Sequence, residues 1–201
     1  MNRIKRLSDL PKVTTAVIII CIAVFAFVHL NSLDGNSAEK AILCGAYYKP
    51  FIIAGEWWRL LTVGFVHTEI WHLAMNLFAM WNLGSLMEKV YGSVKFAAVL
   101  FLSVIFGSVF LFVMTGNSVS VGLSGGLYGL MTAEIYWIVR NGGLKNPQIK
   151  DSLIRTVIIN AAINFVGGIA WQAHLGGAVC GILMAVILDH DPSAKTLRRN
   201  T

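Results

Sequence analysis

A serine stands between glycines at the head of an apolar segment, in the stretch SVSVGLSGGLYGL that covers residues 118–130. Its local pattern, Gly122-x-Ser124-x-Gly126, is that of the nucleophile elbow in soluble hydrolases, where a sharp turn exposes the serine hydroxyl. A histidine within hydrogen-bond reach would take the proton of such a hydroxyl as it attacks a carbonyl carbon. The rest of the chain must decide between a soluble hydrolase, helix packing and a catalytic site.

Three further polar residues in apolar segments could act with Ser124. His72 and Asn76 are four residues apart, which places them on one face of a helix. His174 lies in a third segment and is the natural general base. His72 and Asn76 would then donate to the developing oxyanion, helped by the backbone N–H of Ser124 and the helix dipole. No acidic residue is placed to complete a triad, so the pattern predicts acyl transfer by a Ser-His dyad.

The composition identifies the solvent in which these residues work. Of 201 residues, 56% are hydrophobic and 13% are charged, against about 45–50% and about 25% in soluble domains. The charged residues are too few to give a protein of this size a water-soluble surface. The bilayer must therefore be its main solvent. A soluble hydrolase sheet is therefore not expected. We find no internal repeat or second domain and interpret residues 1–201 as a single membrane domain.

Apolar runs predict an all-α, polytopic fold with six transmembrane helices, each near the about 17 to 25 residues that a span needs. The predicted spans are 13–30, 70–87, 96–114, 123–139, 153–166 and 171–188. The fifth run is short, and its limits are the hardest to place. The first run ends in Phe27-Val28-His29-Leu30, without the small residues of a signal-peptidase site, so we expect it to be retained.

Most of the basic residues lie at one set of span ends. They are Arg3, Lys5, Arg6, Lys12, Lys89, Lys95, Arg140, Lys145, Lys150, Arg155, Lys195, Arg198 and Arg199. The positive-inside rule then places both tails, 1–12 and 189–201, in the cytoplasm. We interpret the net charge of +6 as this topology signal and expect no nucleic-acid partner.

The predicted external loop, residues 31–69, is rich in aromatic residues. They are Tyr47, Tyr48, Phe51, Trp57 and Trp58. Aromatic side chains at headgroup depth are ordinary anchors to membrane lipid. A partly embedded belt and a role in recognition are both open interpretations of this loop.

The sequence predicts no metal, cofactor or disulfide. Cys21 and Cys180 lie in apolar runs, and Cys44 has no obvious partner. The stretch from His67 to His72 reads HTEIWH, which is not the His-Glu-x-x-His pattern of zinc proteases.

The predicted topology provides a separate test of the candidate site. The second, fourth and sixth spans all run from the outside inward, so the polar residues near their starts fall at one depth. Those residues are His72, Asn76, Ser124 and His174. Tyr128, one turn beyond Ser124 on the same face, is placed to pack against the imidazole of His174. Convergence from three helices favours a site over scattered packing residues.

Small residues would let these helices approach closely. The Gly-x-x-x-Gly pairs are Gly122 with Gly126, Gly125 with Gly129, and Gly177 with Gly181. Other polar residues in the spans show no convergence on the site. Glu134, Asn160 and Asn164 are therefore interpreted as interhelical hydrogen-bond partners, with Glu134 in the cytoplasmic half and away from the site.

The ordered set of these motifs resembles the rhomboid family of intramembrane serine proteases. The motifs are EWWRLLTVGFVH (56–67), HLAMN (72–76), EKVYGSVK (88–95), GLSGG (122–126) and AHLGG (173–177). Each alone is weak, and together they are specific. The resemblance implies six helices around a water-accessible cavity that opens to the outside.

By position, the resemblance implies a role for each candidate residue. Ser124 would be the nucleophile and His174 its base, with Tyr128 stacked on that base. His72 and Asn76 would stabilise the oxyanion. The supporting residues would be Gly122 of the GLSGG motif, Trp58 and Arg59 of a structural Trp-Arg motif, and His67 of the same region.

The resemblance also implies a transmembrane protein as substrate, cut in or near a span that can unwind. Helical backbone groups are already paired, so unwinding must precede attack. The fifth helix and residues 164–172 resemble a gate and cap over the cavity. The short fifth span and the lack of an obvious soluble domain suggest a minimal member. The compact length favours a bacterial plasma membrane.

Two other functions are considered. A related protein could bind membrane clients without cutting them, but noncatalytic relatives generally lack the serine or the histidine, and both are present here. A small channel or transporter would need an ion-coupling site, and Glu134 is the only buried acid expected in the spans.

Overall fold

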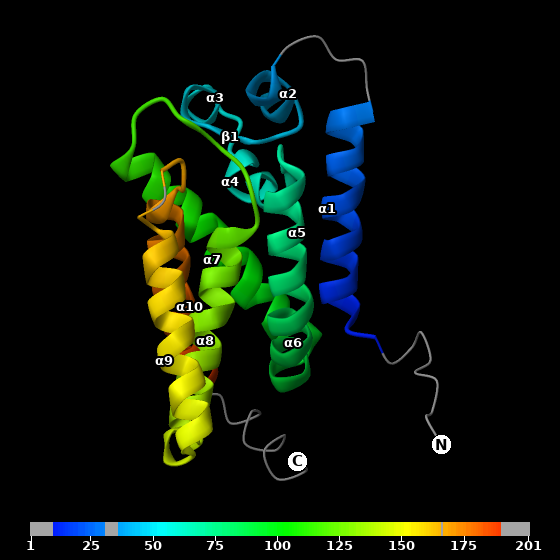
Figure 1. Cartoon of the computed structure of the whole chain (residues 1–201). Helices are drawn as coiled ribbons and strands as arrows, with labels where there is room; N and C mark the ends of the chain where they lie inside the picture. The colour runs from blue at the N-terminus through cyan, green and yellow to red at the C-terminus, as the bar shows by residue number, and fades with distance from the viewer. Residues whose placement is uncertain (1–9, 31–35, 166, 190–201) are drawn as a thin grey trace.

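The computed structural model describes residues 10–30, 36–165 and 167–189 (Figure 1). Most of the basic residues assigned to the two predicted tails lie outside the described residues. These are Arg3, Lys5, Arg6, Lys195, Arg198 and Arg199.

Long helices run side by side and make up most of the molecule (Figure 1). α1 (Lys12–Leu30), α7 (Ser93–Met114) and α10 (Trp171–Asp189) are long and apolar enough to cross a membrane. α8 (Ser124–Arg140) packs against both α7 and α10, and these three helices form the centre of the bundle. α9 (Pro147–Ile163) covers one side and has no buried residue among those described. The prediction of a helical membrane protein is confirmed, while six spans with cytoplasmic termini stay a prediction.

The second predicted span is one helical stretch that changes its winding. α5 (Ile70–Ala79) runs into a π-helix, Met80–Gly84, and then into α6 (Ser85–Tyr91). The wider π turn lies against α1, where Met80 and Gly84 are buried. A π turn shifts the facing side chains along the helix. The helical stretch ends at Tyr91, four residues beyond the predicted end of the span at residue 87.

The limits predicted for the fifth span, 153–166, were wrong. α9 begins at Pro147, where the Asn146 side chain accepts a hydrogen bond from the Gln148 N–H and proline occupies the first turn. The helix ends at Ile163. Its first turns are polar, so a search for apolar residues alone missed them, and its apolar run continues into the loop beyond the helix.

The predicted external loop is folded into short elements at one end of the bundle (Figure 1). They are α2 (Ser37–Leu43), β1 (Tyr47–Tyr48), α3 (Lys49–Ile53), α4 (Arg59–Thr62) and a 3-10 helix, Val63–Phe65.

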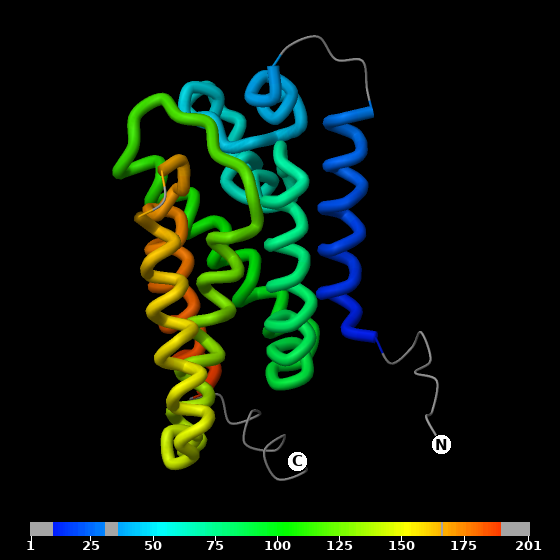
Figure 2. The backbone as a smooth tube through the Cα atoms, in the orientation of Figure 1, coloured from blue at the N-terminus to red at the C-terminus, as the bar shows by residue number. Residues whose placement is uncertain are grey.

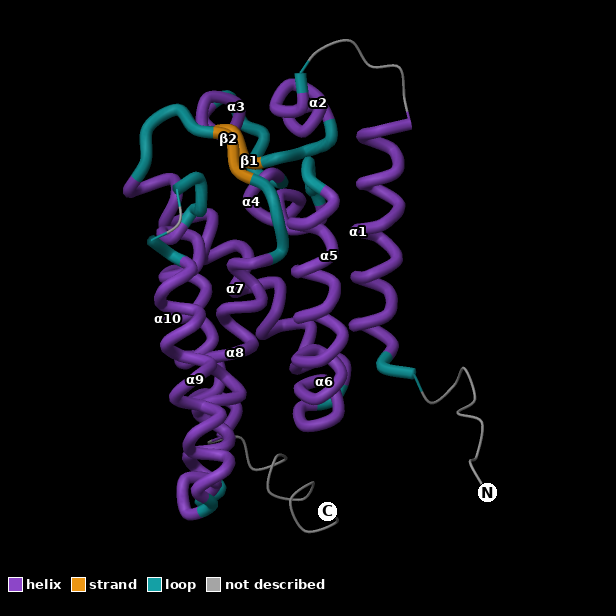
Figure 3. Tube along the Cα trace, viewed as in Figure 1, coloured by secondary structure: helices purple, strands orange, loops and turns teal. Residues whose placement is uncertain are grey.

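Two short strands modify the predicted all-α class. β1 pairs antiparallel with β2 (Val119–Ser120), with Tyr47 opposite Ser120 (Figure 3). Figure 2 shows the segment with β2 arching over this end before it turns down into α8. The pairing therefore connects the segment with β1 to the chain just before Ser124.

The loop aromatics do not form a uniform belt. Tyr47 is fully buried beneath the bundle end, whereas Trp57 and Trp58 are 59% and 58% exposed. Anchoring to lipid remains a prediction for the two exposed indoles, while Tyr47 belongs to the core.

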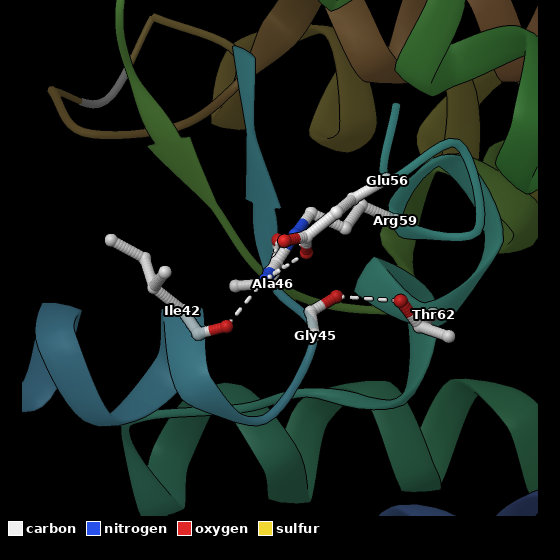
Figure 4. A network of polar contacts seen from close by, with 6 residues as sticks. All are labelled: Ile42, Gly45, Ala46, Glu56, Arg59 and Thr62. Atoms are coloured by element: carbon white, nitrogen blue, oxygen red, sulfur yellow. Dashed lines mark hydrogen bonds and ion pairs between the residues drawn. The ribbon is translucent and has the colours of Figure 1, made fainter. Parts of the chain in front are cut away.

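Arg59 is buried and connects the short elements at this end of the bundle (Figure 4). Its Nη1 donates to the carbonyl oxygens of Ile42 at 2.7 Å and Ala46 at 2.9 Å. Its Nε and Nη2 both lie 2.6 Å from Glu56 Oε2. This satisfied, paired guanidinium fastens the turn after α2 to α4.

Glu88 anchors the start of α1. Its carboxylate accepts hydrogen bonds from the N–H groups of Val13 and Thr14 and from the hydroxyls of Thr14 and Ser93, at 2.6 to 2.9 Å. The first N–H groups of a helix have no partner within it, and a negative charge is favourable there. Glu88 therefore caps a helix 74 residues away in the sequence.

We expect this anchor to make stability depend on pH. Burial raises the pKa of Glu88, but the hydrogen bonds outweigh it and leave the pKa below the ordinary value of 4.5. A carboxyl with a lowered pKa stabilises the fold above that value, and this contribution is lost as the pH falls through the lower folded pKa. Glu88→Gln should lower the melting temperature at neutral pH and flatten its acid dependence. The exposed Asp151→Asn should leave both unchanged, and a Glu88→Gln curve parallel to wild type would contradict this account.

The contact between α8 and α10 depends on small residues, as the glycine pairs predict. A Cβ on Gly177 would overlap the carbonyl oxygen of Gly125, and one on Gly181 would overlap that of Gly129. The two backbones therefore touch along this seam, which brings the first turns of both helices together.

Gly177→Ala should consequently destabilise the protein by about 1–3 kcal/mol or more, because the added methyl group would clash with the backbone of Gly125 and not with a movable side chain. Gly116→Ala is the matched control, since an added Cβ there meets nothing within 4 Å. Thermal unfolding in detergent would measure both. Equal melting temperatures for the two variants would contradict the seam.

Candidate active site

Ser124 and His174 meet where two helices begin. Ser124 is the first residue of α8, and His174 lies in the first turn of α10. His174 Nε2 is 2.8 Å from Ser124 Oγ, within hydrogen-bond distance. His174 is buried, while Ser124 is half-buried. The seam between α8 and α10 therefore produces a serine hydroxyl in contact with an imidazole.

Tyr128 fixes the plane of that imidazole. The two rings are stacked with centroids 4.0 Å apart and an interplanar angle of 9°. Tyr128 stands one turn after Ser124, so a single helix carries both the hydroxyl and the stacking ring.

His72 and Asn76 lie beside the turn that leads to Ser124. Gly122 in this turn has a φ of +111°, a conformation that suits glycine. A Cβ there would lie 2.5 Å from His72 Cε1, 2.6 Å from His72 Nε2 and 3.6 Å from Asn76 Nδ2. Gly122 thus allows this turn of the backbone and leaves room for the His72 ring.

His67 packs behind His72. It precedes α5, is fully buried, and its ring centroid lies 5.1 Å from that of His72 in an edge-on arrangement. Burial, and next the neighbouring His72, lower the pKa of His67 to about 4, so it is neutral at pH 7. His67 is therefore an uncharged group packed against His72, and its supporting role in the site stays a prediction.

The prediction that Asn164 is an interhelical hydrogen-bond partner is confirmed by its contact with Tyr128 of α8, but the expectation that it does not converge on the site was wrong. Its Oδ1 lies 2.6 Å from His174 Nδ1, on the side of the ring away from Ser124. The Gly-Gly pair at 167–168 indicates that a helix ends shortly before it. This was the sequence signal that could have placed Asn164 at a helix end.

The other two polar residues of the spans behave differently. Asn160 bridges helices through its backbone, because its carbonyl accepts from Tyr128 Oη at 2.8 Å, while its side chain donates to Thr156 on its own helix. Glu134 has no hydrogen bond or ion pair with the described residues, so the interhelical contact expected of it is not observed.

The described residues contain no group of three His, Cys, Asp or Glu side chains that could hold a metal ion. Cys21, Cys44 and Cys180 all lie in described segments and are free thiols.

Comparison with known proteins finds a matching family model and relatives that carry the same family name. A family model described as Rhomboid domain matches residues 54–190. The chain is 34% identical to rhomboid protease GluP of Bacillus subtilis (strain 168) over 179 residues, which cover 89% of this chain and 35% of that protein. It is 25% identical to rhomboid protease AarA of Providencia stuartii over 200 residues, covering 86% of this chain and 71% of that protein.

A relative named as inactive is also similar. Inactive RHOMBOID-like protein 8 of Arabidopsis thaliana is 31% identical over 160 residues, covering 77% of this chain and 46% of that protein. The chain spans less than two thirds of the length of this relative and of GluP.

The matched region includes α4 and the 3-10 helix that follows it, the turn at Gly122 and the first turns of α5, α8 and α10. It covers more than half of the chain, and it contains α7 and α10, which are long and apolar enough to cross a membrane. The chain is thus an integral membrane protein and belongs to the rhomboid family.

Proposed function

We propose that this protein is an intramembrane serine endopeptidase that hydrolyses peptide bonds in or near transmembrane segments of other membrane proteins. The observation that carries the proposal is the 2.8 Å contact between His174 Nε2 and Ser124 Oγ. Two relatives named as rhomboid proteases, GluP and AarA, support it. We further propose that the chain is a single rhomboid-like membrane domain.

The proposed reaction has two steps. As Ser124 Oγ attacks the scissile carbonyl carbon, His174 Nε2 takes its proton, and then gives it to the leaving amine when the C–N bond breaks. Water, deprotonated by the same nitrogen, then cleaves the acyl-serine ester and restores the hydroxyl.

The negative oxygen of each tetrahedral intermediate needs donors in place before the reaction. We assign this role to His72, Asn76 and the N–H of Ser124. The N–H groups at the start of α8 are free of intrahelical partners, and the helix dipole is positive there. His72 and Asn76 flank Gly122, two residues before the nucleophile, which supports the assignment.

The proposed topology has six spans with both termini in the cytoplasm and the site open to the external side of a bacterial plasma membrane. α5, α8 and α10 begin at the same end of the bundle in Figure 1, where the short external elements lie. Lys89 lies in α6, which continues from α5, Lys95 lies in the first turn of α7, and Arg140 is the last residue of α8. Basic residues at these positions agree with the positive-inside rule.

The function can be tested with purified single-span substrates in liposomes. Two model proteins would differ only in whether the outer part of the span contains a Gly-Ser pair or is all leucine. We expect cleavage of the first and little of the second, because a helix must unwind before its paired carbonyls can react. Mass spectrometry would locate the cut. Binding of both substrates without cleavage would instead favour a client-binding protein.

Non-proteolytic binding of membrane clients is the alternative function, because one relative is named as inactive. Retention of Ser124 and His174 in hydrogen-bond contact argues for catalysis here. A channel is less well supported, because the described residues offer no group of three His, Cys, Asp or Glu side chains for an ion. The expectation that Glu134 would be the buried acid was wrong: Glu134 is half-buried, and the buried acid is Glu88, which caps α1.

A further inference from the structure

The carboxyl-terminal end of α9 touches the imidazole of His174. Asn164 follows the last residue of α9, and its amide contacts three groups. Oδ1 lies 2.6 Å from His174 Nδ1, while Nδ2 lies 2.8 Å from the carbonyl oxygen of Asn160 and 3.2 Å from Tyr128 Oη. One side-chain amide therefore links α9 to α8 and α10 at the site.

The chemistry of these partners sets the orientation of the amide. The Asn160 carbonyl oxygen can only accept, so the atom facing it must be the donor Nδ2. The Tyr128 hydroxyl gives its proton to the same carbonyl, which leaves its oxygen to accept from Nδ2. Oδ1 of Asn164 is consequently the atom that faces His174.

That orientation selects a tautomer of the base. Oδ1 can only accept, so Nδ1 of His174 must carry a proton, an assignment made from the hydrogen-bond network. In a neutral imidazole, Nε2 then has the free lone pair. This is the nitrogen that lies 2.8 Å from Ser124 Oγ, and it can receive the serine proton. The other tautomer would point a proton at Ser124 and could not act as its base.

We propose that Asn164 is a positioning residue that holds His174 in its Nδ1–H tautomer, so that Nε2 is free to act as base. Stacking on Tyr128 fixes the ring plane, but it does not distinguish the two nitrogens. Asn164 makes that distinction, in the place that an acidic residue holds in a Ser-His-Asp triad. This inference rests on the proposed role of the Ser124–His174 pair.

The other groups around His174 cannot replace the amide. The titratable side chains that interact with it are Tyr128 from α8 and His72 from α5. α7 has no charged residue beyond Lys95, and Glu134 lies ten residues along α8 from Ser124, about 15 Å away. Asn164 is therefore the group placed to accept from Nδ1.

Three substitutions separate positioning from general packing. Asn164→Leu removes the acceptor at similar volume, and Asn164→Asp keeps an acceptor oxygen. Asn160→Ala is the matched control one turn earlier. Within the described part of the chain its side chain bonds only to Thr156 on the same helix, and its bridging carbonyl is retained.

The first measurement does not depend on activity. Nitrogen-15 NMR of histidine side chains would be recorded in a Ser124→Ala background, with His174→Gln to assign the signal. We expect His174 in the Nδ1–H tautomer with Asn164 present and a shift to Nε2–H in Asn164→Leu. An Nδ1–H tautomer that persists in Asn164→Leu would overturn the proposal even if the protein proved not to be a protease.

The second measurement is the rate of labelling by a fluorophosphonate as a function of pH, in protein that retains Ser124. Asn164→Leu should slow labelling by about a hundredfold or more, since a wrong tautomer disables the base. Asn164→Asp should keep most of the rate and move its acid limb to higher pH, because a carboxylate favours the imidazolium. Asn160→Ala should match wild type. Equal losses in Asn164→Leu and Asn164→Asp, or a wild-type rate in Asn164→Leu, would overturn the proposal. A wild-type protein that does not label would instead contradict the proposed function.

Discussion

Ser124→Ala is expected to abolish cleavage of a transmembrane substrate while leaving the protein inserted and folded. The hydroxyl supplies the attacking oxygen, so its loss removes the covalent route and should lower kcat by more than about a thousandfold. Its contact with His174 is its only hydrogen bond to another side chain among the described residues, and a small group replaces it. Melting temperature should therefore change little.

The matched control for this substitution is Ser120→Ala. Ser120 lies four residues earlier, in β2, and pairs with Tyr47 through its backbone. Cleavage in liposomes by Ser120→Ala should match wild type. Residual cleavage by Ser124→Ala at more than a few per cent of the wild-type rate would exclude Ser124 as the nucleophile.

Asn76→Ala should lower kcat by about 10²–10³-fold, the usual effect of removing one donor from an oxyanion hole. The donor acts on charge that exists only in the transition state, so KM should change little. Asn76 is buried beside Gly122, and its Nδ2 also donates to the His72 carbonyl at 3.0 Å. Kinetics with a fluorogenic substrate would separate the two constants.

Asn82→Ala provides the control for that local hydrogen bond. Its Nδ2 donates to the Phe78 carbonyl at 2.8 Å, the same backward contact over four residues, but in the exposed part of the π-helix. Equal effects of Asn76→Ala and Asn82→Ala on kcat would show that the Asn76 effect comes from helix structure and not from the oxyanion.

The core of the site could be predicted because it depends on short-range spacing. Ser124 and Tyr128 are one turn apart on one helix, and the glycine pairs of α8 and α10 predict the close seam that carries His174 to Ser124. These relations follow from helical geometry and small residue size, which the sequence displays directly.

Asn164 and Glu88 could not be placed in this way. The contact of Asn164 with His174 depends on where α9 ends, and the polar first turns of α9 hid its true limits. Glu88 caps α1 across 74 residues, a relation that no local pattern expresses. Hydropathy identified the apolar parts of the spans, but hydrogen bonds that close between distant helix ends required the packed structure.

The most direct test of the Ser124–His174 pair is labelling of purified protein with a fluorophosphonate probe, comparing wild type, Ser124→Ala and His174→Ala. The 2.8 Å contact predicts that wild type is labelled and that both variants lose the label, with Ser124 carrying the adduct in mass spectrometry. If folded wild-type protein in detergent and in lipid shows no more label than Ser124→Ala, the serine is not activated and the protease assignment is wrong.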